Sequence, residues 1–197
     1  MPIDITFADP RNYELAKNGL LVLRPVLDNL GYEWYLGHGT LLGAVREHDL
    51  IFHDNDIDCP INENADLQKV ADALTAADFY ILKLEYFGIS AVVPGAKKSK
   101  EDPWDLHVDI WKQYRYPNNQ VFEVYEKGPW VDTSDGGHPM YNKFIIPAPT
   151  KIIRTTFLGE EFPIPENYDD ILTVEYGDWH KVVKDYKTTD STNFGLW

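Results

Sequence analysis

The stretch GHGTLLGAVREHDLIFHDNDIDCPI, residues 37–61, holds the features that decide the fold prediction. It opens with a glycine turn, continues with a short helix predicted over 40–47 with Thr40 as N-cap, and ends in a strand predicted over 56–61. Side chains two apart in a strand point the same way, so Asp56 and Asp58 project from one face about 7 Å apart at the backbone. Such a pair favours a bound cation, because the two like charges otherwise repel each other.

A second predicted strand, over 106–111, supplies a third carboxylate. Its apolar side chains alternate with polar ones, which puts Asp109 on the face opposite Val108 and lets it meet Asp56 and Asp58 across the sheet. Oxygen ligands of this kind favour Mg²⁺, as one or two ions. Carboxylates around a metal, beside a helix that begins at a glycine turn, are what phosphoryl or nucleotidyl transfer needs. The third aspartate is the candidate general base.

Other interpretations of this cluster remain open. An acidic pair at a loop exit is commonly a solvated surface feature. Asp54 either caps the entrance to the strand or adds another acid to the pocket. His53 and His107 offer imidazole to a transition metal, although a lone histidine is more often a hydrogen-bonded structural residue. Arg46 either contacts a ligand or complements the dipole of its short helix.

The remaining pattern predicts an α+β fold with a mixed sheet flanked by helices. Apolar residues recur at helical spacing in two further long segments and one short one. These predict helices over 10–30, 65–77 and 168–176. Period-two alternation and turn residues predict strands over 32–36, 80–86, 89–93, 121–125 and 143–146, and a hairpin over 151–163. A polar tail follows, and no linker divides the chain, so one domain spans residues 1–197.

Composition narrows the class of protein. The 197 residues are 44% hydrophobic, which is enough for a sizeable core. The formal net charge of −14 argues against a nucleic-acid partner, because phosphates would be repelled. The single cysteine, Cys59, excludes an internal disulfide framework and Cys-rich zinc sites. We expect no signal peptide and no membrane span, and therefore a cytoplasmic location.

Four segments, in order along the chain, resemble the LicD family, which includes bacterial phosphocholine transferases and fukutin-related proteins. The segments are GTLLGAVRE at 39–47, DLIFHDNDID at 49–58, HVDIW at 107–111 and FLGEEFPIPENYDDILTVEYGDW at 157–179. Family members carry Gly-Thr-Leu-Leu-Gly-Ala-Val-Arg and then Ile-Pro-Trp-Asp-x-Asp-Ile-Asp. Phe52 and His53 depart from the Pro-Trp of that pattern, and His38 stands where many relatives have glycine or serine.

The resemblance implies a nucleotidyltransferase fold of the polymerase-beta type. By position, Asp56, Asp58 and Asp109 would hold Mg²⁺. Gly39 and Thr40 would face the phosphates of the donor, and a third residue of this stretch, Arg46, would assist them. The expected reaction moves a phospho-alcohol, such as phosphocholine or ribitol phosphate, or a nucleotidyl group, from a nucleotide-linked donor, typically a CDP-alcohol, to a hydroxyl of an acceptor such as a glycan.

Two rival functions belong to other classes. One is a catalytically silent module that binds a nucleotide or a sugar phosphate. The other is a nucleotidyltransferase that modifies protein or nucleic acid. The negative net charge of the chain disfavours the nucleic-acid substrate, because its phosphates would be repelled.

Overall fold

The structure, a computed structural model, describes residues 6–96, 106–131, 138–183 and 194–196, of which 125–131, 138–143 and 194–196 are described by their backbone alone. The main sheet has eight strands. They are β1 (Asp56–Asp58), β2 (Ile61–Asn62), β3 (Tyr80–Glu85), β4 (Gly88–Val92), β5 (His107–Tyr116), β6 (Gln120–Val131), β7 (His138–Pro147) and β10 (Phe194–Leu196).

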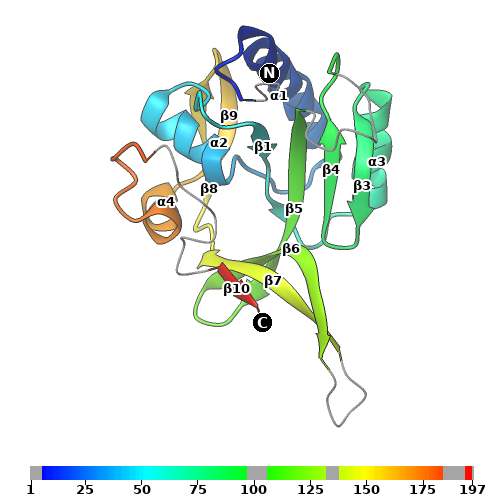
Figure 1. Cartoon of the computed structure of the whole chain (residues 1–197), viewed down its shortest axis with the longest axis vertical. Helices are drawn as coiled ribbons and strands as arrows, with labels where there is room; N and C mark the ends of the chain where they lie inside the picture. The colour runs from blue at the N-terminus through cyan, green and yellow to red at the C-terminus, as the bar shows by residue number, and fades with distance from the viewer. Residues whose placement is uncertain (1–5, 97–105, 132–137, 184–193, 197) are drawn as a thin grey trace.

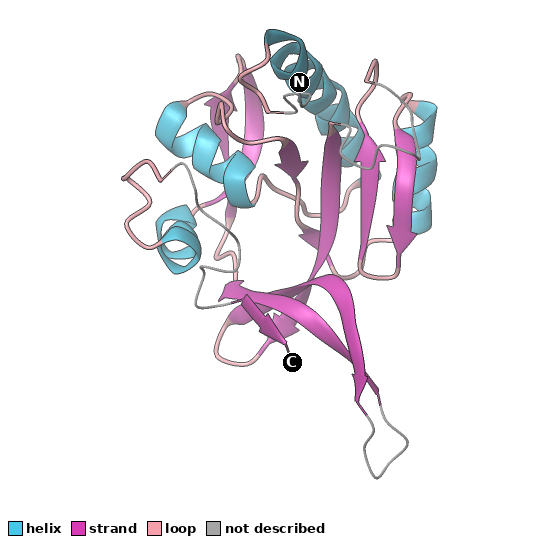
Figure 2. Cartoon of the chain, viewed as in Figure 1, coloured by secondary structure: helices cyan, strands magenta, loops and turns pink. Residues whose placement is uncertain are grey.

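The sheet is mixed, as predicted. Six strands run in the order β10-β7-β6-β5-β4-β3 with antiparallel neighbours, while β1 and β2 pair with β5 in parallel. The central strand β5 therefore has β4 on one side and the short β1 on the other (Figure 1). Below it in the same view, β6, β7 and β10 turn away from the line of β5. The hairpin of β8 (Ile152–Phe157) and β9 (Glu160–Pro165) forms a separate two-stranded sheet (Figure 2).

Helices flank the sheet. They are α1 (Pro10–Leu30), α2 (His38–Leu42) with the π-helical turn η1 (Gly43–Glu47), α3 (Leu67–Ala76) and α4 (Tyr168–Tyr176). The helix α3 packs on β3, β4 and α1, whereas α2 contacts β1 and α4 on the other side of the fold. Among the described residues, no helix combines the length and the hydropathy that crossing a bilayer requires.

The longest helix shows how local sequence sets the boundaries. Asp9 caps the N-terminus of α1, where its Oδ1 accepts a hydrogen bond from the Arg11 N–H at 2.8 Å, and Pro10 occupies the first helical position. Gly31 ends the helix at φ 74°, a left-handed conformation that glycine adopts without a Cβ penalty. The predicted 10–30 helix is confirmed, and its buried face consists of Ala16, Gly19, Leu20, Leu23 and Leu27.

Two local predictions are wrong. Residues 32–36 form only an isolated bridge at Trp34, because the next amides bond to scattered acceptors, such as the carbonyl oxygen of Pro163 for the Leu36 N–H. The predicted 56–61 strand splits after Asp58 into β1 and β2, and Pro60 lies in the break, where it has no N–H to donate. The polar tail, for which no element was predicted, contributes β10 to the sheet.

Candidate active site

The parallel pairing of β1 with β5 builds the site. Its register places Asp56 opposite His107 and Asp58 opposite Asp109. The residues between them point the other way, and both Ile57 and Val108 are fully buried in the core. The polar face of the two strands therefore carries a two-by-two arrangement of three carboxylates and an imidazole. The prediction that Asp109 meets the aspartate pair across the sheet is confirmed by this register.

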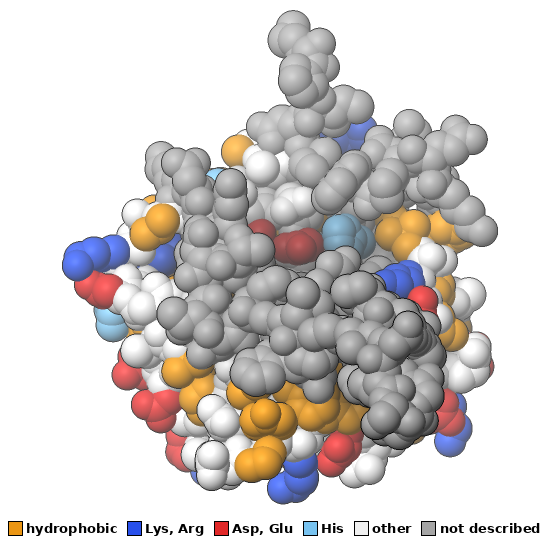
Figure 3. Space-filling view, turned by 60° about the horizontal axis from the view of Figure 1, so that its bottom comes forward, with side chains coloured by type: hydrophobic (Ala, Val, Ile, Leu, Met, Phe, Trp, Pro, Cys, Tyr) orange, Lys and Arg blue, Asp and Glu red, His pale blue; other side chains and the backbone are white. Residues whose placement is uncertain are grey.

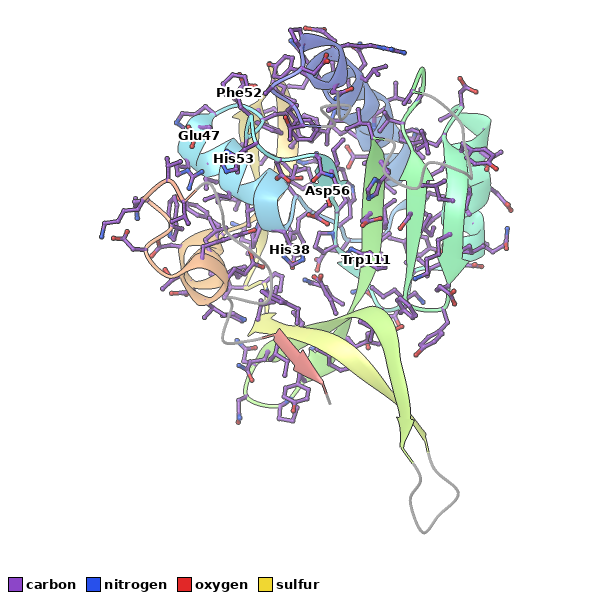
Figure 4. The ribbon with its side chains drawn as sticks, viewed as in Figure 1. His38, Glu47, Phe52, His53, Asp56 and Trp111 are labelled. Atoms are coloured by element: carbon purple, nitrogen blue, oxygen red, sulfur yellow. The ribbon has the colours of Figure 1, made fainter. Side chains whose placement is uncertain are left out.

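The three carboxylates line a cavity of about 370 Å³. Its other lining residues come from α2 with η1, from the segment before β1, from β7 and from the chain at and after α4. Figure 4 shows Asp56 on β1 between α2 and β5. A space-filling view shows acidic side chains beside a histidine in a recess in the middle of one face (Figure 3). Asp54 also lines the cavity, so of its two interpretations the structure favours the additional pocket acid.

Burial of several carboxylates together raises their affinity for protons. Burial, followed by the charge of Asp56, raises the pKa of Asp54 to about 8. Burial and the charge of Asp56 also raise the pKa of Asp58 well above 3.8, while burial and the charge of Asp109 raise the pKa of Asp56. A divalent cation would remove the mutual repulsion that produces part of these shifts.

The geometry fits a divalent cation. Ligand atoms of Asp56, His107 and Asp109 all lie within 4.8 Å of one another. The Oδ1 atom of Asp109 is buried without a hydrogen-bond partner among the residues that the structure describes, which leaves a lone pair for an ion. Asp58 lines the same cavity without joining this close group, and His107 joins it. The three-aspartate set predicted from sequence is thus brought to one cavity, and His107 lies beside two of its members.

Thr40 does not cap α2, contrary to the prediction. The helix begins two residues earlier, at His38, and its N-cap is Gly37. The side chain of Thr40 is buried, and its Oγ1 accepts a hydrogen bond from the Asp58 N–H at 3.0 Å. This bond fixes the end of β1 against α2. The predicted contact of Thr40 with a donor phosphate stays a prediction.

Thr40→Val is expected to lower the free energy of unfolding by about 1–3 kcal/mol, because it leaves the buried Asp58 N–H without an acceptor while keeping the side-chain volume. Urea denaturation measures the loss, and Thr40→Ser serves as the control that restores the hydroxyl. A threonine that served only to contact a ligand would give unchanged unfolding in the valine variant.

Gly39 and Arg46 both line the cavity, and their contact with a donor stays a prediction. A Cβ on Gly39 would collide with Oδ2 of Asp54, so a larger residue here would require the carboxylate of Asp54 to move. The Arg46 guanidinium donates from Nε to Oε1 of Glu47 at 2.7 Å and from Nη1 to the carbonyl oxygen of Trp179 at 3.0 Å. Arg46 thus connects η1 to the chain after α4.

The sequence interpretation missed a buried ion network, two members of which, His38 and Glu175, line the cavity. His38 lies between two glutamates, with Nε2 at 2.8 Å from Oε2 of Glu123 and Nδ1 at 3.1 Å from Oε1 of Glu175. Gln113 extends the network, since its Nε2 donates to Oε1 of Glu123 at 2.6 Å. One signal was available for Glu175: it follows Ile171 by four residues, which places it on the buried face of α4.

Comparisons with known proteins agree with the resemblance seen in the sequence. The family model described as "LicD/FKTN/FKRP, nucleotidyltransferase domain" matches residues 31–167. No curated protein sequence matches the chain. Among solved structures, the crystal structure of the lincosamide antibiotic adenylyltransferase LnuA bound to lincomycin is similar, with a TM-score of 0.48 and 12% identity, over 82% of this chain and 87% of that chain.

Proposed function

Since the chain belongs to the LicD/FKTN/FKRP family of nucleotidyltransferase domains, we propose that it is a Mg²⁺-dependent transferase that uses a nucleotide-linked donor. Family membership supports a transferase of phosphate-containing groups. The proposed donor is a CDP-alcohol, and the group moved is a phospho-alcohol of the phosphocholine or ribitol-phosphate kind, or a nucleotidyl group. The proposed acceptor is a hydroxyl, on a glycan, and the proposed fold is that of polymerase-beta-like nucleotidyltransferases.

One observation carries the proposal: the β1–β5 register directs Asp56, Asp58 and Asp109 into the same cavity. These three residues would hold one or two Mg²⁺ ions, and bound Mg²⁺ would neutralise the charge of the phosphate oxygens. Gly39 and Arg46 line the same cavity and are the proposed contacts for the donor, together with Thr40 as the family pattern implies.

The chain's own residues would then handle the proton. In the proposed reaction the acceptor oxygen bonds to phosphorus, and the bond from phosphorus to the oxygen of the leaving group, either CMP or pyrophosphate, breaks. The proton of the acceptor hydroxyl passes to a carboxylate oxygen of Asp109, the proposed general base. Transfer of a phospho-alcohol from a CDP-alcohol releases CMP, whereas nucleotidyl transfer from a nucleoside triphosphate releases pyrophosphate.

The test incubates the protein and Mg²⁺ with CDP-choline, CDP-ribitol and nucleoside triphosphates, each with glycan acceptors, and measures CMP and pyrophosphate. CMP release that depends on Mg²⁺ and stops with a chelator is the expected result. Thermal stabilisation by a donor, without release of either product under any condition, would instead support the silent binding module. Pyrophosphate release with label transfer to protein or nucleic acid would support the third function.

A further inference from the structure

His107 lies in the close group with Asp56 and Asp109, two of the carboxylates that line the cavity. It begins β5, and the parallel register sets it opposite Asp56. Because it precedes Asp109 by two residues, both side chains point to the same face of the strand. Its Nε2 lies 3.7 Å from Oδ2 of Asp109. His107 therefore faces the same space as the two carboxylates.

These separations suit ligands of a single ion. Nitrogen and oxygen ligands bind divalent transition metals at about 2.0–2.2 Å, so adjacent ligands of one ion are about 3 Å apart and opposite ligands about 4 Å apart. The 3.7 Å between His107 and Asp109 falls inside that interval, and the 4.8 Å limit for the group that includes Asp56 is only slightly above it. Small side-chain rotations would complete the set.

A second observation points to an ion at this place. The Oδ1 atom of Asp109 is buried and has no hydrogen-bond partner within the described part of the chain, although it belongs to a carboxylate beside another carboxylate. A buried carboxylate oxygen in that setting is costly unless a cation or a donor meets it. A cation held jointly by Asp56, His107 and Asp109 supplies that partner.

We propose that His107 is a direct nitrogen ligand of the divalent ion in this cavity, and that it gives the site a preference for a transition-metal ion such as Mn²⁺ over Mg²⁺. Imidazole suits transition metals, whereas Mg²⁺ favours oxygen ligands and retains water. This inference depends on the proposed function for one point only, namely that a divalent ion binds at the aspartates. The roles of the aspartates stay the same, and only the preferred ion differs.

Pulsed electron paramagnetic resonance of Mn²⁺ tests the ligand without any substrate. Spin-echo modulation from a directly bound ¹⁴N is expected in the wild-type protein loaded with Mn²⁺ and is expected to disappear in His107→Gln. Labelling the histidines with ¹⁵N should change the modulation in the wild-type protein, so the test does not depend on a variant that folds. His53→Gln is the matched control, because His53 lines the same cavity but is not part of the close group.

Affinity gives a second readout. Residues that only support a metal ligand change metal affinity about 10–100-fold, so loss of a direct ligand should raise the Kd for Mn²⁺ at least tenfold and reduce the preference for Mn²⁺ over Mg²⁺. Bound Mn²⁺ without nitrogen modulation, or an unchanged Kd in His107→Gln, would overturn the role of His107 and leave the proposed function intact. Failure of the wild-type protein to bind either ion would overturn both.

Discussion

Asp109→Asn is expected to lower kcat/KM for transfer by about 10³–10⁴-fold, with the fold preserved. The substitution keeps the shape of the side chain. It removes one of the negative charges that would hold the proposed ion, and it removes the basic oxygen that would take the proton of the acceptor hydroxyl. Asp109 is suited to both roles, because it lies in register with Asp58 and in the close group with Asp56. Initial rates of CMP release with a CDP-alcohol measure the loss.

A binding measurement separates this effect from misfolding. The melting temperature of the wild-type protein should rise when Mg²⁺ or Mn²⁺ is added, and that rise should be absent or much smaller in Asp109→Asn. Asp72→Asn is the matched control, since Asp72 lies on α3 and its carboxylate only accepts a hydrogen bond from Gln68. An Asp109→Asn protein that kept its rate and its response to the ions would contradict both roles.

The parts of the site that local periodicity encodes could be predicted from the sequence. Alternation fixed which face of β5 carries Asp109, and the spacing of Asp56 and Asp58 fixed the matching face of β1. The family pattern in residues 39–58 then linked these strands to a helix that begins at a glycine turn. These predictions held because strand geometry leaves a side chain only two directions, and the apolar neighbours occupy one of them.

Contacts between distant segments could not be predicted in this way. Glu123 on β6 meets His38 on α2 across 85 residues of sequence, and no local pattern links them. The exact start of α2 was also beyond the pattern, because Thr40 is a good N-cap in isolation but its hydroxyl bonds to β1 instead. His107 looked like a structural histidine for the same reason: only the register reveals that it faces Asp56.

His38→Gln is expected to lower the free energy of unfolding by about 3–5 kcal/mol, because removal of one member of a buried ion network leaves the others uncompensated. Side-chain exposure is 9% for His38, 0% for Glu123 and 2% for Glu175. Burial lowers the pKa of His38, but the charges of Glu175 and Glu123 outweigh burial and hold that pKa well above 6.5. The ring is therefore an imidazolium that donates from both nitrogens.

Urea denaturation at pH 7 measures the loss. His180→Gln is the control, since His180 is 70% exposed and lies 3.8 Å from Asp178 in a surface pair, so its removal should leave the free energy of unfolding nearly unchanged. Adding Glu123→Gln to His38→Gln should recover part of the stability, because it removes one of the buried negative charges that no longer has a counterion. No recovery in the double variant would show that the loss arises from packing.

The pH dependence of this loss identifies its cause. In the wild-type protein the pKa of His38 is raised on folding, so its contribution is complete below pH 6.5 and is lost progressively as pH rises from 6.5 through the higher folded value. In His38→Gln the buried glutamates lack their cation. Burial already raises the pKa of Glu175 above 4.5 in the wild-type protein, and loss of the imidazolium should raise it further. A carboxyl with a raised folded pKa loses its stabilising effect as pH rises.

The difference in unfolding free energy between the wild-type protein and His38→Gln should therefore be small near pH 5, where the glutamates of the variant can take up protons, and should grow toward pH 6.5. Above pH 6.5 it should stop growing, because the unfolded wild-type protein then loses the proton of His38 while the folded protein keeps it, which lowers the stability of the wild-type protein. Unfolding curves at pH 5, 6.5 and 8 measure it. The charge of His38 also lowers the pKa values of Asp54, Asp56 and Asp58, so its removal should raise them and should change the difference in the same direction as the glutamates do. A difference that stayed constant over this range would mean that the ring of His38 stabilises the fold by filling space between α2, β6 and α4 rather than by its charge.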